Sequence, residues 1–124
     1  MEFDAAAVEA EVRTAFDGYE AALGANDVAA LTGYFWQNPR AVRLTTEGGL
    51  YGIEAIAAFR RGRDVSDIAR TLTRVDIVAL APDVAVATAE YRRTGSGRVG
   101  AQSQVWIRRP EGWRIASAHV SLGG

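Results

Sequence analysis

The first part of the chain carries apolar side chains spaced for one face of a helix. They recur at steps of three and four residues, and they are Val8, Val12, Ala15, Phe16, Tyr19 and Leu23. This period predicts an amphipathic helix of about twenty residues, for which Asp4 offers an N-cap. Because Tyr19 belongs to the apolar face, we expect its phenol to point into the protein.

Two shorter helices are predicted next. Asn26 or Asp27 can cap a second helix that runs through Phe35. Pro39 then forces the chain out of helical conformation. A third helix is predicted from Ile53 to about Arg61, because its apolar residues again recur with a helical period.

The remaining sequence alternates with the period of β-strands. A short strand is predicted at Ala41–Thr45, followed by a turn and a return at Leu50–Tyr51. Longer strands are predicted at Ala69–Leu80, Val84–Thr94, Arg98–Arg109 and Trp113–Leu122. The connections between the longer strands are short and contain glycine or proline, so they are typical of hairpins.

Helices followed by a meander of long strands predict an α+β fold. A long, bent sheet needs a cover on its concave side, and the first helix is the candidate long enough to provide it. We therefore expect a cone-shaped fold in which three N-terminal helices pack on a curved mixed or antiparallel β-sheet. Polar side chains that face the open end of this cone are the candidates for chemistry.

Composition narrows the classes of function. A chain of 124 residues predicts a single domain over residues 1–124. Its net charge of −1 gives no electrostatic case for nucleic acid or an anionic membrane. The lack of cysteine excludes disulfides, thiolate metal ligands and a cysteine nucleophile. With one histidine and no metal-ligand spacing, we expect neither a metal nor a cofactor. Since no signal peptide or membrane helix is evident, the expected location is cytoplasmic.

Arg43 is the first candidate site residue, because it interrupts an apolar strand between Val42 and Leu44. Its planar guanidinium can bind a carboxylate through two parallel hydrogen bonds. The alternative is an arginine at the sheet edge that extends to solvent.

Tyr19 is the second candidate. A buried tyrosine usually packs its ring and finds one partner for its hydroxyl, and this structural role is the alternative here. Beside a cation such as Arg43, the phenol could instead donate or accept a proton during a reaction.

Other polar residues could contact a substrate. His119 and Ser121 share one face of the last predicted strand, which we take as the pocket side; a satisfied core histidine is the alternative. Gln104, with Gln102, shares a face with Trp106 and could bind a urea-like carbonyl or amide. The alternative for these glutamines is a solvated outer face.

A dicarboxylate would need a second cation besides Arg43. Arg70 opens the third strand and is predicted to be this second carboxylate ligand, with Arg60 as its competitor. The charged stretch Arg60–Arg63 is otherwise typical of a solvated loop.

Several short motifs, taken together, resemble a known family. They are Tyr19–Leu23, Asn26–Asp27, Phe35–Trp36, Pro39–Arg40, Val42–Arg43, Leu50–Ile53, Ala58–Arg60, Ala69–Leu72, Gln102–Gln104, Glu111–Ile115 and Ala118–Ser121. The order of elements resembles the nuclear transport factor 2-like (SnoaL-like) cone fold. Within that fold, the motifs resemble the branch of the oxalurate-catabolism protein and the dicarboxyurea amidohydrolase, over nearly the whole chain.

This resemblance implies a catabolic enzyme that acts on a small N-carboxylated urea without a cofactor. The better-described members convert 1,3-dicarboxyurea to allophanate with loss of one carboxyl group, and a tyrosine and an arginine match Tyr19 and Arg43. Arg70, Gln104, His119 and Ser121 are then expected to position the substrate. One departure is visible, since Gly48–Gly49 stand where the family often has Glu-Asn, and this leaves the identity of the substrate open.

The sequence leaves two other functions open. The chain could be a non-catalytic ligand-binding or accessory subunit of an amidase, docked through its sheet. It could also be an isomerase like the ketosteroid branch, which needs a carboxylate base in an apolar pocket. Asp76 and Glu90 lie on predicted strands but have polar or charged neighbours.

Exposed sheets of this kind pair readily, so a homodimer is expected as well.

Overall fold

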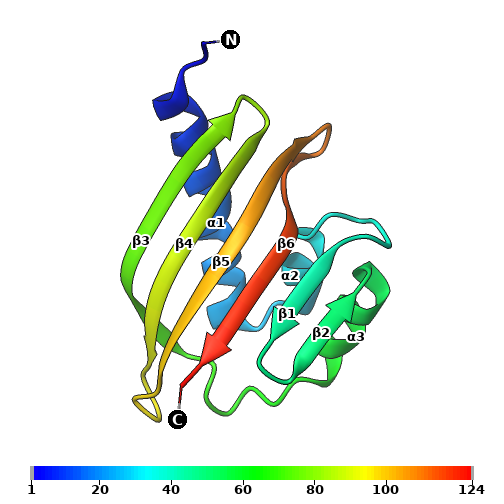
Figure 1. The fold of residues 1–124 in the computed structure, drawn as a ribbon. Helices are drawn as coiled ribbons and strands as arrows, with labels where there is room; N and C mark the ends of the chain where they lie inside the picture. The colour runs from blue at the N-terminus through cyan, green and yellow to red at the C-terminus, as the bar shows by residue number, and fades with distance from the viewer. Residues whose placement is uncertain (1, 124) are drawn as a thin grey trace.

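Helices lie on one face of a six-stranded sheet in the computed structural model, which describes residues 2–123 (Figure 1). The helices are α1 (Ala5–Ala25), α2 (Val28–Gly33) and α3 (Ile53–Gly62). Across the described residues, no helix has the length and apolar content needed to cross a membrane. The α+β class and the three helices expected from the sequence are confirmed.

Side chains near the helix ends explain where the first two helices begin and end. The Asp4 carboxylate accepts a hydrogen bond from the Ala7 amide at 3.0 Å, which fixes the start of α1. Asn26 ends α1 in the left-handed conformation, with φ of 50°. Asp27 then accepts from the Ala30 amide at 3.1 Å and caps α2. The two candidate caps therefore have separate roles, one closing α1 and the other opening α2.

The strands follow the predicted order with small shifts at their ends. They are β1 (Val42–Thr45), β2 (Gly48–Tyr51), β3 (Arg70–Ala81), β4 (Val84–Arg93), β5 (Val99–Arg109) and β6 (Gly112–Leu122). In space they run β2-β1-β6-β5-β4-β3. All neighbours are antiparallel except β1 and β6, which pair in parallel and place Arg43 beside Ala118. The sheet is therefore mixed.

The core lies between the concave face of the sheet and the helices. Figure 1 shows α1 crossing behind β3, β4 and β5, while α2 lies behind β6 and β1. Small inward side chains on β4, Ala85, Ala87 and Ala89, are fully buried and leave room for α1. Residues of β5 alternate strictly, so that Gln102 and Gln104 face inward and Ser103 faces out.

Aromatic packing fixes the ring of Tyr19 within this core. Its ring meets those of Tyr34, Phe35 and Trp106 edge to face, with centroids 6.1 to 6.5 Å apart. Tyr91 packs across Gly100 of the neighbouring strand, where an added Cβ would lie 2.3 Å from the Tyr91 ring. Glycine at this position therefore lets a second tyrosine reach the same region of the interior.

Candidate functional site

A small cavity opens on the concave side of the sheet, close to the C-terminal end of β6. Its lining comes from α1, from α3 and the residue that follows it, and from all strands except β2: Tyr19, Leu23, Arg43, Arg60, Arg63, Arg70, Tyr91, Arg93, Gln102 and Val120. The free space among these side chains is about 10 Å³, which is room for one water molecule. A ligand larger than water must therefore displace some of these side chains.

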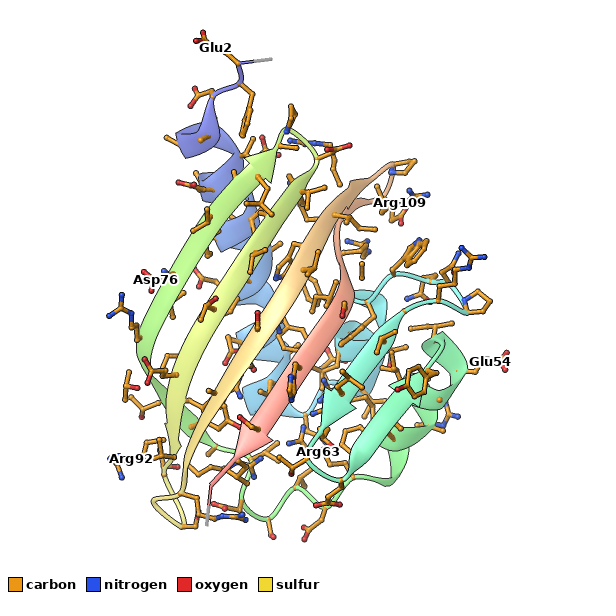
Figure 2. The ribbon with its side chains drawn as sticks, in the orientation of Figure 1. Glu2, Glu54, Arg63, Asp76, Arg92 and Arg109 are labelled. Carbon is orange, nitrogen blue, oxygen red and sulfur yellow. The ribbon has the colours of Figure 1, made fainter. Side chains whose placement is uncertain are left out.

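The cavity continues outward into a wider hollow of about 170 Å³. Arg43, Arg63 and Arg93 line both spaces, and Figure 2 shows Arg63 near the tip of β6 and beside β1. The β1–β2 turn, residues 45–47, bounds the hollow on its outer side. Gly48 and Gly49, the departure from the family pattern, belong to the same hairpin but line neither space.

Tyr19 and Arg43 line the same cavity, as the catalytic hypothesis requires. Tyr19 is 4% exposed and Arg43 is 5% exposed. The Arg43 guanidinium lies over the ring of Phe59, with its Cζ 4.6 Å from the centroid. The alternative in which Arg43 extends to solvent is therefore wrong.

The charge on Arg43 is poorly compensated by the protein. Burial, and then the neighbouring charge of Arg60, lower the pKa of Arg43 to about 10. Within residues 2–123, its Nη1 atom is buried without a hydrogen-bond acceptor. An anion that enters the cavity would satisfy this group and relieve both effects.

Arg60 and Arg63 also belong to the cavity, and their assignment to a solvated loop is wrong. Arg60 lies in the last turn of α3 and is 2% exposed. One turn earlier on the same face lies Ile56, which is fully buried. Burial, followed by repulsion from Arg60, lowers the pKa of Arg63 to about 10. The helical spacing from Ile56 is the signal in the sequence that could have identified Arg60.

The hydroxyl of Tyr19 contacts Arg60 directly. Arg60 Nη2 donates a hydrogen bond to Tyr19 Oη. Across the part of the chain that the structure describes, Arg60 Nε and Nη1 are buried and without acceptors. Arg60 therefore combines a fixed contact to the phenol with further donors that are unused.

Arg70 lines the cavity, as expected, but its guanidinium is already occupied. Its Nε and Nη2 atoms lie 3.1 and 2.5 Å from the two carboxylate oxygens of Glu20. Nη2 also donates to Gln102 Oε1 at 3.0 Å, and the guanidinium stacks over Tyr91. Since Arg70 is paired in this way, Arg60 is the better placed of the two competing cations for a second carboxylate.

The remaining predicted substrate contacts have different outcomes. Gln104 faces inward and is 1% exposed, so the solvated-face alternative is wrong; its Oε1 accepts from Trp106 Nε1 at 3.0 Å. Gln104 does not line the cavity, whereas Gln102 does. Ser121 shares the depression on the outer face of the sheet with His119 and also reaches the edge of the outer hollow, so it does not line the cavity as expected; its hydroxyl donates to the Ala101 carbonyl at 3.4 Å.

The placement of His119 on the pocket side is wrong. His119 is exposed on the outer face of the sheet, in a shallow depression that also includes Thr88 and Ser103. On either side of it, Ala118 is buried and Val120 lines the cavity. Because strand residues alternate between faces, these two apolar neighbours identify the inward face of β6, and His119 must point the other way.

The cavity holds more positive than negative charge. Five arginines line it, and two of them face a carboxylate: Arg70 pairs with Glu20, and Arg93 Nη1 lies 4.0 Å from Asp67. Among residues 2–123, no group of three or more histidines, cysteines and acidic residues could hold a metal ion. The site is therefore suited to a small anion with more than one negative charge.

The acidic residues considered for isomerase chemistry lie elsewhere. Asp76 is exposed and pairs with Arg74 at 2.8 Å, and Figure 2 shows it at the outer edge of β3. Glu90 is exposed as well. Neither lines the cavity, so neither can act there as a general base.

Comparisons with known proteins agree on family and fold. The AtzH-like family model matches residues 1–124. A Pectobacterium atrosepticum protein of unknown function from the DUF3225 family is 47% identical, with a TM-score of 0.90 over 96% of this chain and 93% of that one. A cystatin-like fold protein from Burkholderia xenovorans is 36% identical, with a TM-score of 0.86 over 93% of this chain and 91% of that one.

A more distant structure extends the likeness in fold. The nuclear transport factor 2-like superfamily protein from Salmonella enterica is 24% identical, with a TM-score of 0.76 over 96% of this chain and 93% of that one. No protein with a curated description matches the sequence. The chain belongs to the AtzH-like family and has the nuclear transport factor 2-like fold.

Proposed function

We propose that this protein is a cofactor-free enzyme of nitrogen catabolism that removes a carboxyl group from an N-carboxylated urea. The reaction is of the type that converts 1,3-dicarboxyurea to allophanate. The observation that carries the proposal is the meeting of Tyr19 and Arg43 in one cavity, where Arg43 and Arg60 have buried guanidinium atoms without acceptors in residues 2–123. Membership of the AtzH-like family supports the same conclusion.

Arg43 holds the carboxylate that will be lost. Its Nη1 atom has no acceptor within residues 2–123 and can donate to a ligand, and its stacking on Phe59 fixes the plane of the guanidinium. The substrate carries a second carboxylate, for which Arg60 and Arg63 supply charge at the same cavity. Binding by two cations fixes the substrate in one orientation and so lowers the entropic part of the barrier.

Tyr19 supplies the proton that the reaction needs. The bond between the carboxylate carbon and the urea nitrogen breaks, and its electron pair stays on nitrogen. Nitrogen takes the phenolic proton as carbon dioxide leaves, and water then reprotonates the phenolate. The step consumes one proton for each carbon dioxide released, and no oxidant, reductant or metal takes part.

The proposal is tested by incubating the purified chain alone with freshly generated 1,3-dicarboxyurea. We expect carbon dioxide to be released faster than in the buffer control, without release of ammonia. Ammonia from the chain alone would indicate hydrolysis of the urea amide instead. A rate equal to that of the buffer overturns the enzymatic function, and a rate that appears only with an added amidase would favour the accessory role.

Binding can be tested apart from turnover with malonate, a stable small dicarboxylate. An excess of about 100 times the dissociation constant contributes about 2.7 kcal/mol, which for a chain of this size raises the melting temperature by about 10 °C. We expect this shift with malonate and a much smaller one with acetate, measured at equal ionic strength. Equal shifts with malonate, acetate and sodium chloride would contradict a site that binds two carboxylates.

A further inference from the structure

We propose that Arg60 is a positioning residue that holds the Tyr19 phenol with its proton directed into the cavity, and that it stabilises the phenolate left after proton transfer. This inference rests on the proposed function and assigns a role to a residue outside the Tyr19–Arg43 pair. It follows from the hydrogen bond between Arg60 and Tyr19 and from the charges around it.

The direction of the hydrogen bond follows from the chemistry of the two groups. A guanidinium has five donors and no acceptor, so in its contact with Arg60 the Tyr19 oxygen must accept. The phenolic proton is then left for another partner. Within residues 2–123, no other hydrogen bond involves Tyr19 Oη, and the phenol lines the cavity. The proton is therefore available to a ligand that fills the cavity.

The ring of Tyr19 leaves the phenol little freedom to adopt another arrangement. Three aromatic neighbours surround it edge to face, and the side chain is 4% exposed. Arg60 is 2% exposed and enters from α3, so it reaches the oxygen from a different element than the one that carries Tyr19. Two rigid helices thus fix donor and acceptor independently.

Arg60 is the cavity arginine that donates to Tyr19, and unlike Arg70 and Arg93 it has charge available for a phenolate. Arg70 is neutralised by Glu20, and Arg93 lies near Asp67 and donates to its carbonyl. No ion pair joins Arg60 to a carboxylate in the described part of the chain. When the phenol gives up its proton, the existing hydrogen bond becomes charge-assisted at both ends and is therefore strengthened.

The first test reads the phenol directly and needs no turnover. In Raman spectra, the ratio of the two tyrosine Fermi-doublet bands rises when the phenol oxygen accepts a hydrogen bond and falls when the phenol only donates one. The difference between wild type and Tyr19→Phe isolates the Tyr19 contribution. We expect a high ratio in wild type, a lower ratio in Arg60→Met, and a decrease on adding malonate to wild type, because the phenol then also donates.

The second test asks whether Arg60 acts through Tyr19, by a double-mutant cycle with 1,3-dicarboxyurea. We expect Arg60→Met to lower kcat by about 10²–10³. It should also raise KM, because Arg60 supplies charge for the second carboxylate of the substrate. In the Tyr19→Phe background, Arg60→Met should lower kcat by no more than about threefold, because the group that Arg60 serves is already gone. Arg60→Lys, which keeps the charge without the planar fork, should restore part of the loss.

Arg61→Met is the matched control, because Arg61 is exposed on the same helical turn. It should leave the Raman ratio, kcat and KM unchanged. Additive losses in the double mutant, or an unchanged Raman ratio in Arg60→Met, would overturn the inference. If wild type shows no turnover, the proposed function fails, and the Raman ratios still decide whether Arg60 holds the phenol as described.

Discussion

Changing Tyr19 to phenylalanine is expected to lower kcat for 1,3-dicarboxyurea by about 10²–10⁴, because the reaction loses its proton donor. The substitution removes one oxygen and keeps the ring, so the edge-to-face contacts with Tyr34, Phe35 and Trp106 persist. KM should change little, since the carboxylates still meet Arg43 and its neighbours. The measurement is steady-state release of carbon dioxide, with the far-ultraviolet circular dichroism spectrum as the check on folding.

Tyr34→Phe provides a matched control for this substitution. The Tyr34 ring lies 6.1 Å from that of Tyr19, yet Tyr34 does not line the cavity. We therefore expect wild-type kcat from Tyr34→Phe. A Tyr19→Phe variant that retains the wild-type rate would remove the phenol from the mechanism, whatever else the cavity binds.

Local signals in the sequence were sufficient for most of the fold. The Asp4 cap, the apolar period through Leu23 and the turns between the long strands each act over a few residues, and the observed elements match them. The parallel pairing of β1 with β6 is different, because it joins residues about 75 positions apart, such as Val42 and Ser117. No local pattern specifies such a partner.

The candidate site was only partly predictable, for reasons of burial and charge. Arg43 was identifiable because a charge between two apolar strand residues is unusual. Arg60 was named only as the competitor of Arg70, because the run of arginines around it is typical of solvent-exposed sequence, where burial of a guanidinium is costly. At the cavity the guanidinium groups are buried in spite of this free-energy cost, and some of their nitrogen atoms lack acceptors in the described structure.

His119 was assigned to the wrong face because its possible chemistry was given more weight than the apolar residues beside it. A lone histidine between two serines suggested a functional face, although the apolar residues at 118 and 120 marked the opposite face as buried. Gln104 is a polar residue that does face the interior, but its side-chain oxygen accepts a hydrogen bond from Trp106 and does not face the cavity. The faces of a strand are therefore better assigned from its apolar residues than from its polar ones.

Changing Arg43 to alanine is expected to lower kcat/KM by about 10²–10³, because a truncated partner of a buried, charge-assisted contact typically costs 2–5 kcal/mol, and every 1.4 kcal/mol is about tenfold. Unlike a paired arginine, Arg43 leaves no carboxylate unpaired when it is removed, and its own buried Nη1 lacks an acceptor in residues 2–123. The free protein should therefore keep a melting temperature near that of wild type.

Malonate separates the loss of binding from a loss of chemistry in this variant. Arg43→Ala should lose most of the melting-temperature shift that malonate produces in wild type, whereas Tyr19→Phe should keep it. Arg43→Lys should recover little, because an ammonium is a point charge on a different stem and cannot bind a carboxylate through two parallel hydrogen bonds. Arg74→Ala is the control, since Arg74 is exposed and pairs with Asp76 away from the cavity. A full malonate shift in Arg43→Ala would place the anion site elsewhere, and the chemistry assigned to this cavity would then lack its substrate.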